Sequence, residues 1–144
     1  MKEVAEPVTI NNPANISGKY ILLAEDDEDD IFMLRSFFRK IPGSPELYVV
    51  NKGDKVISML ENLPLNNLPS LIILDYNLPS MNGYEILHIL SRDKKYKSVP
   101  VVIWSTSNSP YYESQCQEAI AYLVKPSDQN GFQALVQKLL TYIH

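Results

Sequence analysis

The stretch Leu71-Ile72-Ile73-Leu74-Asp75 decides the fold, because four bulky apolar residues stop at a carboxylate. A short apolar run bounded in this way is typical of a strand that is buried on both faces of a parallel sheet. Three further apolar runs also end at a polar side chain. These are residues 20–24 before Glu25, residues 101–104 before Ser105 and residues 121–124 before Lys125. Because functional groups collect at the carboxyl ends of parallel strands, the sequence predicts one pocket built from these side chains.

Helical patterns lie between the strand-like runs. The clearest is at the C-terminal end, where apolar residues recur at i, i+3, i+4, i+7, i+8 and i+11 from Phe132 to Ile143. Weaker stripes are marked by Ile31/Leu34/Phe38, Val56/Leu60/Leu63 and Tyr84/Leu87/Leu90, and residues 47–50 add a fifth strand. Strands that alternate with helices imply right-handed crossovers. The predicted fold class is therefore α/β, a doubly wound five-stranded parallel sheet of the flavodoxin-like (βα)5 type with helices on both faces.

The segment between residues 105 and 121 is the least regular part of this pattern. Residues 107–110 read Ser-Asn-Ser-Pro and favour a loop. Only Tyr112, Cys116 and Ala119 indicate a buried helix face. Any helix in this segment is expected to be short.

The length and composition fit one domain. The chain has 144 residues, 45% of them hydrophobic, and this is enough to bury an ordinary core. Residues 1–18 contain Pro7, Pro13 and several asparagines without hydrophobic periodicity, and they lack the basic-then-apolar pattern of a signal peptide. We expect a flexible leader over residues 1–18 and a single folded domain over residues 19–144.

Charge and cysteine content argue against several classes of protein. The net charge of -4 offers no broad attraction to nucleic acid or anionic lipid, although residues 92–97 are locally basic. The single cysteine, Cys116, excludes an internal disulfide and fits a reducing compartment. No stretch reaches the roughly 20 apolar residues that a membrane span needs. We therefore expect a cytoplasmic protein that binds neither nucleic acid nor membrane.

The acids at the strand ends predict a cation. Glu25 and Asp26 leave the first strand, and Asp75 leaves the third, which is its expected neighbour in the sheet. Clustered carboxylates repel one another and take up protons unless a cation neutralises them. Oxygen ligands without a cluster of His or Cys select a hard ion, and Mg²⁺ commonly takes one or two carboxylates together with water and phosphate oxygens. We predict Mg²⁺ as the cofactor, with Asp26 and Asp75 as direct ligands and Glu25 acting through water.

Each of these residues also has an ordinary interpretation when it is taken alone. The acidic run at residues 25–30 suits a solvated helix start, where the helix dipole favours negative charge. Asp75 could cap a turn, because the sequence that follows it is rich in turn signals. Ser105 could be a loop hydroxyl and Lys125 a surface charge. Their joint placement at successive strand ends favours the pocket.

The ordered set of motifs resembles the response-regulator receiver domain of two-component signalling, the CheY-like phosphoacceptor domain in its stand-alone form. The resemblance covers roughly residues 19–143. Its matching stretches are Ile21–Asp27, Leu71–Gly83, Val99–Ser105 and Ala121–Pro126. Any one of them is a modest match, whereas the ordered set is specific. The segment between Ser105 and Tyr122 departs from the family by being about two residues shorter than usual.

The resemblance implies roles for the residues of the acidic group. Asp75 corresponds to the phosphorylated aspartate. Glu25 and Asp26 correspond to the acidic pair that holds the metal, and Asn77 to the residue that lends it a backbone carbonyl. Asp75 would attack a phosphoryl group and become an acyl phosphate, which is nucleophilic chemistry by a carboxylate.

The resemblance also implies a switch. Ser105 corresponds to the switch hydroxyl, Lys125 to the phosphate-binding lysine and Tyr122 to the switch aromatic. The new charge on Asp75 would draw Ser105 and Lys125 inward and let an exposed Tyr122 ring rotate into the space that Ser105 leaves. Tyr122 could instead be an ordinary aromatic at a strand edge. The family usually has the Lys125–Pro126 bond in cis, a form that is accessible at X–Pro bonds.

The resemblance implies partners rather than a substrate. The phosphoryl donor would be a histidine kinase or a phosphotransfer protein, and the chain would not be an enzyme beyond promoting its own Asp phosphorylation and dephosphorylation. No effector domain follows Ile143, so output is expected through an unknown downstream protein or through a homodimer.

Three other functions compete with this interpretation. A phosphatase of the haloacid dehalogenase type would need a second acid two residues after its aspartate, where Asn77 stands. A flavodoxin-like nucleotide binder would hold phosphate with a Gly- or Ser-rich loop after the first strand, where this chain is acidic. The stronger rival is a receiver-like docking module that is never phosphorylated.

Overall fold

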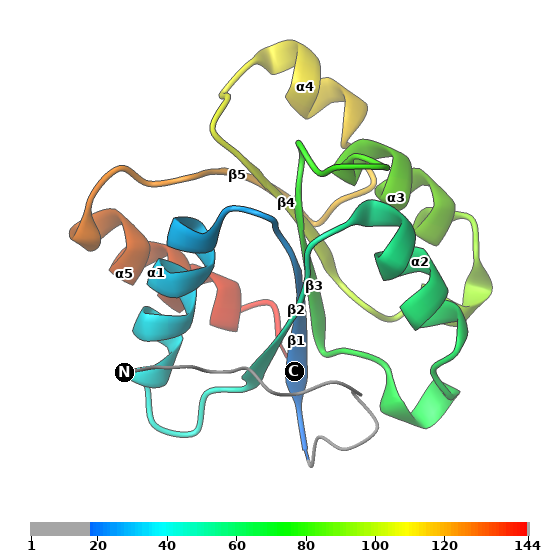
Figure 1. Ribbon diagram of the computed structural model, residues 1–144, viewed down its shortest axis with the longest axis horizontal. Coiled ribbons are helices and arrows are strands. Elements are labelled where there is room, and N and C mark those ends of the chain that lie inside the picture. Colours follow the sequence, from blue (N-terminus) through cyan, green and yellow to red (C-terminus); the bar gives the residue numbers. More distant parts are fainter. Residues whose placement is uncertain (1–17, 144) are drawn as a thin grey trace.

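Five parallel strands form one sheet through the middle of the molecule, in the order β2-β1-β3-β4-β5 (Figure 1). The strands are β1 (Tyr20–Ala24), β2 (Glu46–Val50), β3 (Leu71–Asp75), β4 (Val101–Ser105) and β5 (Ala121–Val124). The computed structural model describes residues 18–143, so the predicted leader lies outside the described residues except for Gly18. The doubly wound parallel sheet predicted from the sequence is confirmed.

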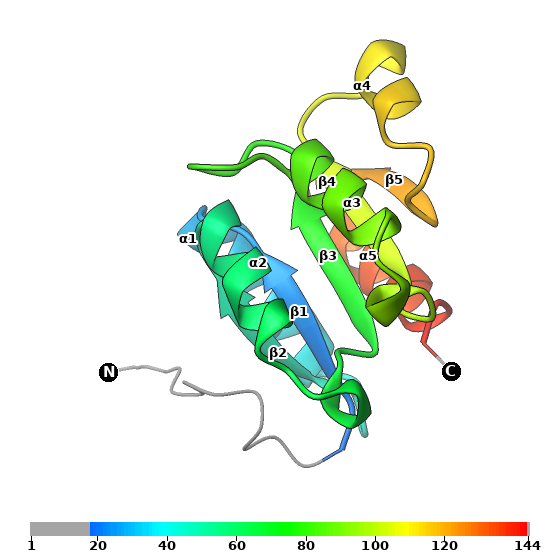
Figure 2. The same ribbon diagram turned by 90° about the vertical axis from the view of Figure 1, so that its right-hand side faces the viewer.

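Two layers of helices cover the sheet. The helices are α1 (Glu28–Arg39), α2 (Gly53–Glu61), α3 (Gly83–Ser91), α4 (Pro110–Gln115) and α5 (Gln129–Leu140), with short 3₁₀ turns η2 (Leu65–Asn67) and η3 (Lys94–Tyr96). Helices α1 and α5 lie on one face, and α2 and α3 lie on the other (Figure 1). Figure 2 shows α4 standing apart from these pairs, beyond the β4–β5 side of the sheet.

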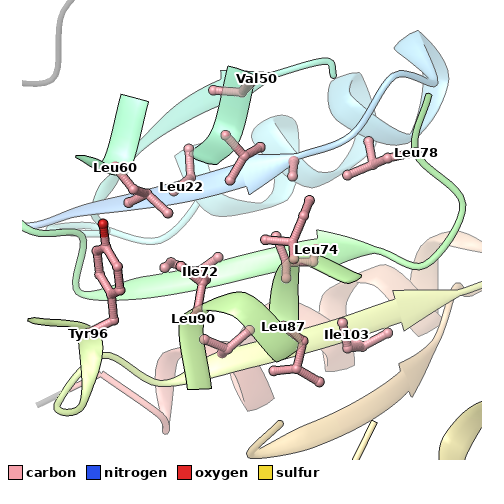
Figure 3. Packing of buried hydrophobic residues seen from close by; sticks show 14 of the residues in the cluster. Leu22, Val50, Leu60, Ile72, Leu74, Leu78, Leu87, Leu90, Tyr96 and Ile103 are labelled. Carbon is pink, nitrogen blue, oxygen red and sulfur yellow. The ribbon is translucent and has the colours of Figure 1, made fainter. Parts of the chain in front are cut away.

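The core consists of two apolar clusters separated by the sheet. In β1, Ile21 and Leu23 point to the α1–α5 side, whereas Leu22 and Ala24 point to the α2–α3 side. Every residue of β1, β3 and β4 is buried. This explains why these strands are continuous apolar runs rather than alternating ones. Figure 3 shows the α2–α3 side, where side chains from the strands meet those from the helices.

The strand ends are aligned by the register of the sheet. Ala24 of β1 pairs with Leu74 of β3, so the next residues along both strands, Glu25 and Asp75, leave the sheet side by side. Asp75 in turn pairs with Trp104 of β4, which places Ser105 one residue farther along the neighbouring strand. The sheet therefore delivers the polar residue that follows β1 and those that end β3 and β4 to one edge.

The α4 segment is short, as the sequence predicted. Pro110 occupies the first turn of a six-residue helix, where its missing N–H costs no hydrogen bond, and Cys116 ends the helix. No residue within α4 is buried, but Tyr112 and Ala119 pack against the α2–α3 core and Cys116 is buried in it. Within residues 18–143, none of the helices is long and apolar enough to cross a membrane.

Candidate functional site

Three carboxylates meet at the carboxyl ends of β1 and β3. Glu25, Asp26 and Asp75 each offer one oxygen, and these atoms lie within 4.8 Å of one another. Glu25 is completely buried and Asp75 is 4% exposed, whereas Asp26 faces solvent. The structure therefore brings together the three acids that the sequence had placed at separate strand ends.

Lys125 enters the same place from the end of β5. Its Nζ donates to Asp75 Oδ2 at 3.2 Å and lies 2.9 Å from Glu25 Oε1 as an ion pair. Only 6% of the lysine side chain is exposed. The Lys125 N–H donates to the Ser105 carbonyl at 2.7 Å, which fixes the backbone from which the side chain reaches inward.

The expectation of a cis Lys125–Pro126 bond is wrong, because residues 18–143 contain no cis peptide bond. Trans is the lower-energy form at X–Pro bonds. The backbone bond from Lys125 to Ser105 and the length of the lysine side chain suffice to bring the ammonium to Asp75. A cis bend is therefore not needed to form the pocket.

A fourth carboxylate, Asp30, was missed as a member of the pocket. Its Oδ2 accepts a hydrogen bond from Lys125 Nζ at 2.8 Å, the shortest of the three contacts that this ammonium makes with acids. From its place in the acidic run at residues 25–30, Asp30 was expected only at the start of a helix. A signal was present, because Asp30 is four and eight residues before the buried Leu34 and Phe38 and so continues the inward stripe of α1.

The charges of the pocket shift the pKa values of its members. Burial raises the pKa of Glu25 to about 8, the neighbouring Asp75 carboxyl adds to the rise, and Lys125 opposes it. Burial by itself would lower the pKa of Lys125, but hydrogen bonds to Asp30 and Glu25 and the charge of Asp75 raise it instead. The lysine therefore stays charged, while Glu25 holds a proton more readily than an exposed glutamate does.

The donor set suits a divalent cation. Glu25 Oε2 accepts the N–H groups of Asp26 and Asp27, and the buried Oε1 has the Lys125 ammonium 2.9 Å away as its ion-pair partner. This one ammonium also contacts Asp30 and Asp75, so it leaves the acids of the pocket with excess negative charge, and a further cation or a metal-bound water against these oxygens would lower the cost of their burial. Oxygen ligands alone, with excess negative charge, match hard ions such as Mg²⁺. The acids present therefore fit the predicted cofactor.

The loop after β3 is built tightly around Asp75. The Asn77 N–H donates to Asp75 Oδ1 at 3.1 Å, so the backbone of Asn77 lies next to the carboxylate. Gly83 begins α3 against the same backbone, and a Cβ at this position would lie 2.5 Å from the Asp75 carbonyl oxygen. Asn82 and Glu85 form a capping box there. The Asn82-Gly83 pair, one of the turn signals that follow Asp75 in the sequence, thus starts a helix that packs against the site.

The two predicted switch residues are connected through one loop. Ser105 is completely buried, and its Oγ accepts the Ser107 N–H at 3.1 Å. Tyr122 is half-buried, and its hydroxyl donates to the Ser107 carbonyl at 2.7 Å. Burial raises the pKa of Tyr122. The exposed Tyr122 ring expected from the sequence is therefore wrong, because the ring already packs against the α2–α3 core.

Two aromatic side chains beside the pocket were also missed. The ring of Trp104 lies 4.9 Å from Lys125 Nζ, measured to the ring centroid. Tyr76, the residue after Asp75, stacks on Tyr112 of α4 with ring centroids 4.6 Å apart and bonds through its hydroxyl to Gln115. The stacking and the hydrogen bond of Tyr76 join α4 to the residue that directly follows Asp75.

Fold and site together define a class of protein. The strand order reverses direction between β1 and β3, and this topological switch point is where open α/β sheets place their functional sites. An acidic pocket at this point, with a hydroxyl after β4 and a lysine after β5, is the arrangement of a CheY-like signalling domain. The family model of the response regulator receiver domain matches residues 21–137. This chain belongs to that family, the receiver domain of two-component response regulators.

Individual relatives agree with this assignment. The two-component response regulator ORR11 of Oryza sativa subsp. indica is 32% identical over 123 residues, which are 84% of this chain and 80% of the relative. Among solved structures, a phosphorylated cyanobacterial phytochrome response regulator, RcpA, superposes with a TM-score of 0.78 at 26% identity, over 88% of this chain and 94% of that one. The Mn²⁺-bound response regulator Rcp1 gives a TM-score of 0.76 at 27% identity, over 86% and 93%.

Proposed function

We propose that Asp75 accepts a phosphoryl group from a phosphohistidine donor, which is a histidine kinase or a phosphotransfer protein. The observation that carries this proposal is a buried carboxylate in contact with a buried ammonium, beside two further acids. In the reaction, an Asp75 oxygen bonds to phosphorus while the phosphorus–nitrogen bond of the donor breaks, and the imidazole leaves with the electron pair. The product is an acyl phosphate on Asp75.

The chain's own residues prepare this step. Lys125 offers a positive charge 3.2 Å from the Asp75 carboxylate, where it can meet a phosphoryl oxygen. Asp26, Asp75 and the Asn77 backbone carbonyl would hold Mg²⁺ directly, and Glu25 would act through a water. The bound ion would offset the negative charge of the phosphoryl oxygens. No catalysis beyond the chain's own phosphorylation and dephosphorylation is proposed.

The switch is proposed to run through Ser105 and Tyr122. A phosphoryl group on Asp75 adds charge and three strong acceptors, which can attract the Ser105 hydroxyl. Ser105 Oγ would then leave the Ser107 N–H, and the loop that also holds the Tyr122 hydroxyl would rearrange. A rearrangement there changes the α4–β5 surface, which we propose is read by a downstream protein or by a second copy of this chain.

The test is intact mass spectrometry after incubation with acetyl phosphate and Mg²⁺. A gain of one acid-stable, base-labile phosphoryl group is expected for the wild-type chain, and none is expected for Asp75→Asn or in the presence of a chelator. Binding of beryllofluoride, a phosphoryl mimic, is measured in parallel because acetyl phosphate can be a poor donor. If the wild-type chain takes up neither group, a docking module that is never phosphorylated becomes the better interpretation.

A further inference from the structure

The Lys125 ammonium forms ion pairs with three carboxylates in the pocket, those of Glu25, Asp30 and Asp75, and these carboxylates are not equivalent. Glu25 and Asp75 belong to the acid cluster that can hold a cation, whereas Asp30 does not. Asp30 also comes from a different element, the first turn of α1, and makes the shortest contact at 2.8 Å. Lys125 Nζ donates hydrogen bonds to Asp30 and Asp75 and forms an ion pair with Glu25.

Asp30 is held firmly in its place. Its N–H donates to the side chain of Asp27, the N-cap of α1, at 3.0 Å. The helix itself is fixed by Leu34 and Phe38, which are buried in the α1–α5 core. The Asp30 side chain is 23% exposed, so its contact with Lys125 is largely shielded from solvent. A carboxylate anchored in this way is a fixed acceptor rather than a mobile surface charge.

A bound divalent ion changes the balance among the three partners. The ion occupies lone pairs of the cluster carboxylates and repels the ammonium, so the contacts of Lys125 with Glu25 and Asp75 weaken. Asp30 lies outside the cluster and keeps its full attraction for the lysine. The Trp104 ring beside Nζ can add only a weaker attraction.

We infer that Asp30 is a positioning residue, which holds the Lys125 ammonium at the pocket when the cation is bound and so keeps it within reach of the incoming phosphoryl group. This inference rests on the proposed function and adds a residue to it. Without Asp30, the metal-loaded pocket would push the lysine away from Asp75. The phosphoryl group would then lose its lysine contact while the cation kept its ligands.

The test compares Asp30→Asn with Asp29→Asn. Asp29 lies in the same first turn of α1 but is exposed and is not among the acids that pair with Lys125, so the control removes an equal charge from the adjacent position. Mg²⁺ affinity is followed by the fluorescence of Trp104, the single tryptophan of the chain. Beryllofluoride affinity is then measured at saturating Mg²⁺, and thermal unfolding verifies that each variant is folded.

For Asp30→Asn, we expect beryllofluoride affinity to fall by about 10-fold or more, the usual cost of losing a residue that orients a site ligand. The change in Mg²⁺ affinity should be several times smaller. Asp29→Asn should change neither. In the Lys125→Met background, Asp30→Asn should have no further effect, because a residue that acts through the lysine has nothing left to position. Asp30→Glu keeps the charge, should retain part of the affinity, and replaces the Asn variant if that one does not fold.

Two results would overturn the inference while leaving the proposed function intact. In the first, the wild-type chain binds beryllofluoride and Asp30→Asn behaves like Asp29→Asn. In the second, Asp30→Asn costs as much in the Lys125→Met background as in the wild type, which would mean that it acts on the general field or on folding. A wild-type chain that binds no beryllofluoride overturns the proposed function and this inference with it.

Discussion

The two sides of the sheet edge differ in how firmly they are held. At the ends of β1 and β3, every strand residue is buried, and Glu25 and Asp75 are held by the Lys125 ammonium, which reaches them from the end of β5. At β5 and α4, the strand is only half-buried and ends with Val124 45% exposed, and the helix itself buries no residue. Segments with few buried contacts open at lower free energy than the core does. The acids that meet Lys125 thus lie on the tightly packed side, and α4 lies on the thinly packed side.

Individual side chains join the two sides, in addition to the packing of the α4 segment against the α2–α3 core. Tyr76 reaches from the Asp75 loop to Tyr112 and Gln115 of α4, and Tyr122 reaches from β5 to the Ser107 carbonyl. Because few contacts hold α4 in place, the position of this helix depends strongly on each of them. Changes in the pocket should therefore affect global stability most, whereas changes at these connections should act mainly on residues 106–116.

Removing the lysine should have the largest effect. Lys125→Met leaves buried carboxylates without their counter-charge, and it should destabilise the metal-free protein by about 3 kcal/mol. Urea unfolding measures this loss, and added Mg²⁺ should restore part of it. Lys138→Met, at an exposed position of α5, is the control and should change stability little. A loss no greater than that of the control would show that the pocket is not tightly coupled to folding.

The second-largest effect is expected when a side chain is added at Gly83, where α3 approaches the backbone of Asp75. In Gly83→Ala, the new Cβ would lie 2.5 Å from the Asp75 carbonyl oxygen, so either α3 or the strand end must move. We expect a loss of about 1–3 kcal/mol in unfolding free energy, together with weaker beryllofluoride binding. Ser91→Ala, in the exposed last turn of the same helix, is the control. Unchanged stability in Gly83→Ala would contradict the close approach of α3 to Asp75.

The raised pKa of Glu25 predicts a pH dependence on the rigid side. Because this pKa is about 8 in the folded chain against an ordinary 4.5, the folded state binds more protons over that interval. In the absence of metal, the Glu25 contribution should be fully present below pH 4.5 and be lost as the pH rises through 8. Urea unfolding at several pH values, compared with Glu25→Gln, measures this loss.

The same pKa makes metal binding depend on pH. A cation at the pocket favours ionised Glu25, so Mg²⁺ affinity should rise with pH by up to about 10-fold per unit and level off above a pH of about 8. Titration of the Trp104 fluorescence at several pH values measures this slope. In Glu25→Gln the slope should disappear. A slope that persists in this variant would assign the proton to another group.

Substitutions at the side chains that connect to the α4 segment should have the smallest effects on global stability. Tyr76→Phe removes the hydrogen bond to Gln115 and should cost about 1 kcal/mol or less in global stability. Amide exchange should nevertheless become faster in residues 110–116, because the helix depends on few contacts. Tyr122→Phe, which removes the bond to Ser107, is the matched variant and should loosen residues 106–109 instead. Equal exchange changes throughout the domain would contradict a separately held α4.

Prediction from the sequence worked well wherever the order of residues along the chain decides the position in space. Strand-terminal residues of a parallel sheet all arrive at one edge, so the meeting of Glu25, Asp26, Asp75 and Lys125 could be predicted from their places after apolar runs. The short α4 was also predictable, because Pro110 and the polar residues before it interrupt any longer helix. The prediction of a cis Lys125–Pro126 bond was wrong, because it was taken from the resemblance to the family and not from the residues of this chain.

For Asp30, the sequence pattern predicts the helix face on which the residue lies but not the residue that it contacts. The spacing of Asp30 to Leu34 and Phe38 shows that it faces inward, because a helix repeats every 3.6 residues. Whether an inward acid meets a lysine depends on the packing of α1 against α5 and on the path of the chain after β5, which are contacts between distant segments. The sequence by itself determined the parallel sheet, the polar residues that stand at the ends of its strands, and the acidity of the pocket. Only the tertiary structure decided that the ammonium is shared with α1 and that α4 is held through Tyr76, because side-chain reach across layers depends on packing and not on periodicity.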